Sequence, residues 1–217
     1  TDGDAGGFDP TIARSEIPTI RRAEQRAAGA AVGVTDIHFL GYHDGELEVT
    51  QAVRRDISRV IRQVRPDVVI CQSPEINYDR IYASHPDHLA AGAAAIAAVY
   101  PDARNPFTFT ELLDEGFEAH TAWQVWIMGG PNPNRFVDTT AQLDRKIAAL
   151  RCHASQHPDP DAMEASRTRV IPHKARGGVD PVVQGRLIGP RREVKANGTL
   201  VTTAGSTSSL SPTVGTG

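Results

Sequence analysis

Apolar positions in the first third of the chain recur with the period of an α-helix. The helix predicted after Thr50, whose hydroxyl suits an N-cap, ends before Pro66. The apolar face of this helix comprises Val53, Ile57, Val60, Ile61 and Val64. Residues 15–31 are rich in arginine, glutamate, glutamine and alanine and are followed by Gly33, so we expect an earlier helix there.

Short apolar runs alternate with these helices. Residues 34–40, 68–71 and 123–128 are expected to be strands, and the continuous run 68–71 is typical of a buried parallel strand. An alanine-rich helix is predicted up to about residue 99, and a last helix begins near residues 138–140. Leu143, Ile147 and Leu150 share one face of that last helix. This alternation predicts a layered α/β domain with a mainly parallel sheet, whose active site lies beyond the carboxyl ends of the strands.

Composition and charge exclude several classes of function. The 217 residues are 40% hydrophobic and carry a net charge of −3, which favours neither nucleic acid nor an anionic membrane as a partner. No apolar run reaches the roughly 18 residues of a membrane span, and no signal peptide is visible. The two cysteines, Cys71 and Cys152, lie far apart in the sequence, so we expect free thiols and a cytoplasmic protein. Oligomeric state is not predictable from these features.

The chain divides near residue 174. Residues 1–173 are expected to form the domain, whereas residues 174–217 are rich in glycine, serine, threonine and proline, with more basic than acidic residues. This composition predicts a low-complexity, disordered tail. The chain begins at Thr1 and not at a methionine, and the run 1–7 resembles a loop that leaves an earlier element, so we expect a cropped amino terminus.

The run Ser84-His85-Pro86-Asp87-His88 is the strongest candidate for chemistry. Helix initiation alone explains part of it, because Ser84 and Asp87 have the spacing of a capping box and proline suits the first helical turn. It does not explain two histidines, which are mediocre helix formers but common metal ligands and acid–base catalysts. We therefore predict a functional site where this helix begins.

Weaker candidates lie elsewhere in the chain. Arg21 is either an exposed helix arginine or a planar group for substrate hydroxyls or phosphate. Asp44 followed by Gly45 has the chemistry of a turn. His153 and His157 have a spacing compatible with metal binding on a helix, but no third ligand is evident nearby, so a structural role is expected for His153.

The chain resembles the LmbE/PIG-L family of zinc-dependent de-N-acetylases over about residues 1–157. The resemblance rests on the order and spacing of five short matches: 1–6 (TDGDAG), 21–24 (RRAE), 41–45 (GYHDG), 84–88 (SHPDH) and 153–156 (HASQ). The resemblance implies a Rossmann-like, three-layer α/β sandwich. It also implies hydrolysis of an N-acetyl or related N-acyl group on an amino-sugar conjugate, which is a small-molecule substrate.

The resemblance also implies a role for each candidate residue. His88 would be a Zn²⁺ ligand, and His85 would assist the tetrahedral intermediate as an acid or an oxyanion partner. Asp87 would orient and charge-stabilise His85. Arg21 and Asp44 would bind the substrate.

The family pattern includes an H-P-D-D motif that supplies two zinc ligands and the general base, and this motif does not occur before Ser84. A catalytic zinc takes about three protein ligands. The remaining ligands, with the first strands of the sheet, are therefore expected upstream of Thr1, and we expect the fragment itself to be inactive. Two alternatives stay open: a non-catalytic sugar-binding relative without a metal site, and another metallohydrolase such as a phosphodiesterase.

Overall fold

The structure is a computed structural model that describes residues 1–168 and 182–188. The helices are α1 (Ile17–Ala31), α2 (Gln51–Val64), α3 (Pro86–Ala97), α4 (Glu111–Asp114), α5 (Leu143–Arg151) and α6 (Pro160–Thr168). The strands are β1 (Val68–Gln72), β2 (Gln124–Met128), β3 (Arg135–Asp138) and β4 (Val182–Ile188). Each of the three long helices predicted before residue 100 is present. Thr50 caps α2 as expected, because its side chain accepts a hydrogen bond from the Val53 amide at 3.2 Å.

The strands form one sheet in the order β1-β2-β4-β3. β1 and β2 are parallel, with Val68 opposite Gln124 and Gln72 opposite Met128. The α/β class and the parallel pairing predicted from the sequence are thus confirmed. β4 adds an antiparallel strand between β2 and β3, which the sequence pattern did not predict.

Two predicted segments differ in the structure. Residues 182–188, expected to belong to a disordered tail, form β4, because this short run gains partners in both β2 and β3. The rest of the predicted tail lies outside the described residues. Residues 34–40, expected to be a strand, have no strand assignment, because they pair with no strand among the described residues.

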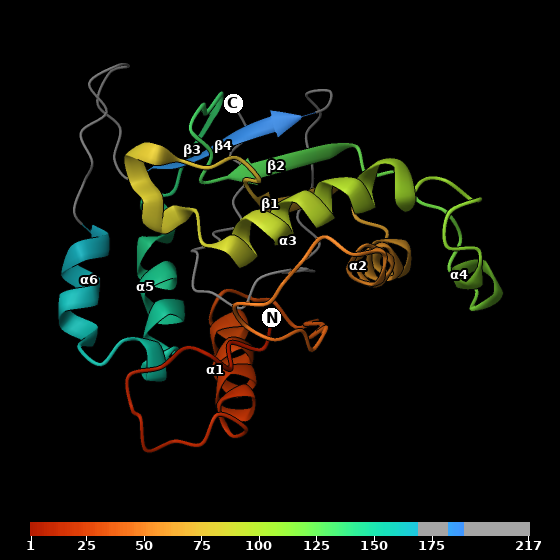
Figure 1. The fold of residues 1–217 in the computed structure, drawn as a ribbon. Helices are drawn as coiled ribbons and strands as arrows, with labels where there is room; N and C mark the ends of the chain where they lie inside the picture. The colour runs from red at the N-terminus through yellow and green to blue at the C-terminus, as the bar shows by residue number, and fades with distance from the viewer. Residues whose placement is uncertain (169–181, 189–217) are drawn as a thin grey trace.

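α3 and α2 bury the main core together with the sheet. In Figure 1 α3 runs in front of the strands, with α2 seen end-on beside it. Buried side chains of α2, including Ile57 and Ile61, join Ala91 and Ala95 of α3 and Ile127 of β2 in one apolar cluster. The small alanines let α3 approach both neighbours closely.

α1, α5 and α6 form a second group of helices on one side of the molecule (Figure 1). Ile147 and Leu150 of α5, predicted to share one face, are buried with Met163 of α6. α1 is tied to this region by the Glu24 carboxylate, which accepts hydrogen bonds from the Ser155 amide at 2.7 Å and the Ser155 hydroxyl at 2.8 Å. Within the described part of the chain, no helix is both long and apolar enough to cross a membrane.

Candidate active site

α3 carries its first residues beyond the carboxyl end of β1. Gly92 makes this packing possible, because a Cβ at that position would lie only 2.3 Å from the carbonyl oxygen of Gln72, the last residue of β1. Pro86, six residues before Gly92, therefore lies about 9 Å further along the helix axis. The two histidines of the motif are thus at the edge where α/β sheets bind their ligands, as predicted.

His85 caps α3. Its Nδ1 accepts a hydrogen bond from the Asp87 amide at 3.2 Å, and Pro86 occupies the first helical position. The predicted capping box is wrong, because the Ser84 hydroxyl instead accepts from the Asn77 amide at 2.8 Å. With Nδ1 acting as an acceptor, a neutral His85 carries its proton on Nε2. The exposed His85 side chain is therefore set to donate a hydrogen bond from Nε2.

His88 lies one helical turn further on and is half-buried. Its ring centroid is 5.4 Å from that of His85. Burial first, and then the charge of His85, lower the pKa of His88, against the opposing influence of Asp87 and Asp44. A neutral imidazole is the form that binds a metal ion.

The Asp87 carboxylate holds a neighbouring loop. This side chain is buried and accepts hydrogen bonds from the Gly45 amide at 2.7 Å and the Leu47 amide at 3.2 Å. It is the backbone amide of Asp87 that contacts the His85 ring. Asp87 thus joins the start of α3 to the loop that contains Asp44, and its predicted charge effect on His85 stays a prediction.

Asp44 and Arg21 meet at Gly6. A Cβ at Gly6 would lie 2.7 Å from Arg21 Nη2 and 3.6 Å from Asp44 Oδ2, so glycine leaves the room that these side chains occupy. Burial and the neighbouring Asp87 carboxyl raise the pKa of Asp44, against the lowering influence of His85 and Arg21. Burial lowers the pKa of Arg21.

Arg21 is not an exposed helix arginine, which was one of the two interpretations that the sequence left open. Its Nε and Nη1 atoms are buried and have no hydrogen-bond partner among the described residues. Buried guanidinium donors without partners are costly unless something else accepts their protons. This observation favours the substrate-binding reading of Arg21.

Asp4 fixes the other side of the Asp44 loop. Its buried carboxylate accepts hydrogen bonds from the Asp44 amide at 2.8 Å and from the Arg14 guanidinium at 2.9 Å. The same carboxylate pairs with the His43 ring at 3.0 Å. Burial alone would raise the pKa of Asp4, but these hydrogen bonds lower it to about 2. The sequence alone did not indicate this network.

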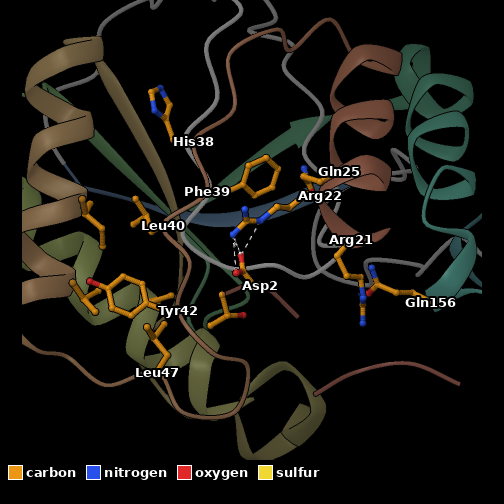
Figure 2. Close-up of a pocket in the computed structure, with 14 residues that line it drawn as sticks. Asp2, Arg21, Arg22, Gln25, His38, Phe39, Leu40, Tyr42, Leu47 and Gln156 are labelled. Atoms are coloured by element: carbon orange, nitrogen blue, oxygen red, sulfur yellow. Dashed lines mark hydrogen bonds and ion pairs between the residues drawn. The ribbon is translucent and has the colours of Figure 1, made fainter. Parts of the chain in front are cut away.

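A pocket adjoins the site, and Figure 2 shows Arg21 and Gln156 side by side at one end of it. Leu40, Leu47 and Ile57 are among the apolar side chains that line it. His85, Asp87 and His88 do not line this pocket. Arg21 belongs both to the pocket and to the Asp44 side of the candidate site, so it connects the two.

The described residues alone do not fit a complete zinc site. No group of three or more histidine, cysteine, aspartate or glutamate side chains among them is placed to hold a metal ion. His153 is buried, and burial lowers its pKa, in agreement with the structural role expected for it. Among the described residues, His88 is the one that the family resemblance implies as a metal ligand.

Comparisons with known proteins show what the chain is similar to. Residues 1–99 match the family model described as "PIG-L: GlcNAc-PI de-N-acetylase". The chain is 34% identical over 159 residues to the diacetylchitobiose deacetylase of Thermococcus kodakarensis, covering 73% of this chain and 58% of that protein. It is 32% identical over 148 residues to a probable N-acetyl-alpha-D-glucosaminyl L-malate deacetylase 2 of Bacillus cereus, covering 66% of this chain and 60% of that protein.

A solved structure extends the likeness to the fold. The N,N′-diacetylchitobiose deacetylase from Pyrococcus horikoshii, complexed with its inhibitor MPG, has a TM-score of 0.75 and 28% identity over 86% of this chain and 70% of that chain. The chain thus spans about three fifths of the length of the two curated relatives above.

Fold and site together define an α/β domain with a histidine–carboxylate site at the carboxyl edge of its parallel strands. Residues 1–99 match the PIG-L family model, and the two curated relatives above are a diacetylchitobiose deacetylase and a probable N-acetyl-alpha-D-glucosaminyl L-malate deacetylase.

Proposed function

We propose that the protein hydrolyses the acetamide of an N-acetylated amino-sugar conjugate. The observation that carries this proposal is the assembly at the start of α3, where His85 and His88 lie beside Asp44 and Asp87 within a family segment. Hydrolysis adds the oxygen of water to the acetyl carbon, breaks the bond to nitrogen and leaves acetate and a primary amine. The amine nitrogen must gain a proton, and the carbonyl oxygen must be stabilised while it carries negative charge.

The side chains at the start of α3 and in the neighbouring loops can supply these interactions. A neutral His85 presents Nε2–H as a donor for the developing oxyanion, because the Asp87 amide occupies Nδ1. Arg21 and Asp44 offer a donor and an acceptor for the hydroxyls of the sugar. Asp87 positions the Asp44 loop against α3 through its bonds to the Gly45 and Leu47 amides.

We also propose that His88 is one ligand of a Zn²⁺ ion. A lowered pKa keeps the His88 imidazole neutral and able to bind a metal. Since the described residues do not complete a site by themselves, zinc binding requires donors from outside them. Turnover is therefore expected only where such donors complete the site.

Amine and acetate release from N,N′-diacetylchitobiose by the intact protein tests these assignments. His85→Ala is expected to retain zinc and lose roughly 10²-fold or more in kcat. His88→Ala is expected to lose zinc, measured as bound metal per chain, together with turnover. His120→Ala is the matched control, because the His120 ring lies against the Pro66 carbonyl and away from the motif.

Each alternative has its own outcome. Full turnover by either His85→Ala or His88→Ala would refute the role assigned to that residue. Sugar binding without amine release would favour the non-catalytic relative, and release of phosphate from a phosphodiester would favour the phosphodiesterase.

A further inference from the structure

The segment between β1 and α3 exposes an unusual run of large apolar side chains. Tyr78 is 83% exposed, Tyr82 72%, Ile81 65% and Ile76 43%. All four fall within seven consecutive positions, immediately before His85. Large apolar side chains gathered in this way mark a binding surface more often than isolated ones do.

This segment is held at both ends. At its start, the Ser73 amide donates to the Met128 carbonyl at 2.8 Å and the Glu75 amide donates to the Ser73 hydroxyl at 3.0 Å. At its end, Ser84 accepts from the Asn77 amide and donates its own amide to the Ile81 carbonyl, each at 2.8 Å. The exposed rings therefore lie on a backbone with defined anchors.

A small pocket with a mainly apolar lining lies at the start of the same segment. Ser73 and Glu75 line it together with Gly130 and Asn132 from the turn after β2. Gly130 allows the close approach, because a Cβ there would lie 3.2 Å from the Ser73 hydroxyl. In Figure 1 the yellow segment after β1 passes beside the green turn after β2. The Glu75 carboxylate and the Asn132 amide thus lie at the start of the segment that carries the exposed rings.

We propose that the surface formed by Ile76, Tyr78 and Ile81, with the adjoining Glu75 and Asn132, binds the second, neutral sugar ring of the substrate. This inference rests on the proposed deacetylase function. A pyranose ring presents C–H groups on its faces and hydroxyls at its rim, which suit aromatic faces flanked by polar groups. Glu75 and Asp79 are exposed and lie within three residues of Tyr78 in the sequence, so their charges disfavour an acidic substituent more than a neutral ring.

The position of the surface fits this assignment. Ile81 precedes the His85 cap by only four residues, so the segment that carries the surface leads directly into the residue that begins the candidate active site. A substrate with its acetamide at His85 would extend its second ring along the segment. An N-acetylated monosaccharide would not reach it.

The test compares substrates of different length with the intact protein. Tyr78→Ala is expected to lower kcat/KM for N,N′-diacetylchitobiose by about three- to tenfold, the usual value of an aromatic contact, and to leave N-acetylglucosamine unchanged. Tyr100→Ala is the matched control, because Tyr100 is 65% exposed but lies beyond the other end of α3. An equal fall for both substrates, or no fall for either, would overturn the proposal.

Two further arms separate this inference from the proposed function. If the wild-type protein releases no amine, the proposed function fails, and calorimetric titration with chitotriose still tests the surface. Weaker chitotriose binding by Tyr78→Ala, with unchanged binding by Tyr100→Ala, supports the sugar-binding surface. Equal binding by Tyr78→Ala and the wild type overturns it. The wild type is also assayed with an N-acetylglucosamine–malate conjugate. If it prefers this acidic substrate and Tyr78→Ala reduces the preference, the proposal that the ligand is neutral is overturned. If Tyr78→Ala changes the oligomeric state and leaves sugar binding unchanged, the surface binds a second copy of the chain and the sugar proposal is overturned.

Discussion

Replacing Gly92 by alanine probes the contact that sets the position of the whole motif. An added Cβ would lie 2.3 Å from the Gln72 carbonyl oxygen, 3.0 Å from the Gln72 carbonyl carbon and 3.1 Å from the Pro74 nitrogen. All three are backbone atoms at the end of β1, so no side-chain rotation relieves the collision. Ordinary contact begins at 3.4 Å, and α3 must therefore move away from β1 by roughly 1 Å.

This displacement has two measurable consequences. Overpacking of this kind costs about 1–3 kcal/mol, and alanine returns about 1 kcal/mol through its better helix propensity, so a net loss of up to about 2 kcal/mol is expected. His88 lies four residues before Gly92 on the same helix and moves with it. A displacement of about 1 Å at a reacting group can reduce turnover by roughly 10²-fold.

Urea unfolding and steady-state deacetylation of the intact protein measure the two effects. Gly29→Ala in α1 is the matched control, because its Cβ would lie 2.8 Å from the movable end of the Ile37 side chain. We expect Gly29→Ala to change the free energy of unfolding by less than about 1 kcal/mol and to leave turnover intact. A Gly92→Ala protein with wild-type stability and turnover would show that the contact with β1 does not position the motif.

Two further changes test the loops around the site. Asp87→Ala leaves the Gly45 and Leu47 amides without their acceptor, so the free energy of unfolding should fall by about 2–4 kcal/mol in urea, and an unchanged value would contradict the buried geometry. Asp4 has a folded pKa of about 2 despite its burial, below the ordinary aspartate value near 4, so its ionised form stabilises the fold above about pH 4. As pH falls from about 4 to 2, about 2 kcal/mol should be lost from the wild type, and Asp4→Asn should lack this part of the pH dependence.

Features that depend on neighbours in the sequence were the predictable ones. The Thr50 cap forms with an amide three residues away, and the start of α3 follows from Pro86 and the residues around it. Even here the predicted capping residue was wrong, because the sequence indicated Ser84 and the structure has His85. The Ser84 hydroxyl instead accepts from the Asn77 amide.

Features that depend on distant partners were not predictable in the same way. The run 182–188 becomes β4 through pairing with strands more than 40 residues earlier, which its own composition does not show. The meeting of Arg21 with Asp44 at Gly6 likewise joins three separate segments. One signal was present for the contact of α3 with β1, because a single glycine in an otherwise alanine-rich helix is typical of a close backbone approach.

Helix capping and chemistry, which began as competing explanations of the His85–His88 motif, describe the same contact. His85 caps α3 with Nδ1, and that hydrogen bond leaves Nε2 as the donor in the neutral ring. A serine or aspartate in this place would cap the helix equally well but would offer no imidazole to the substrate. The cap therefore selects the tautomer that oxyanion stabilisation needs.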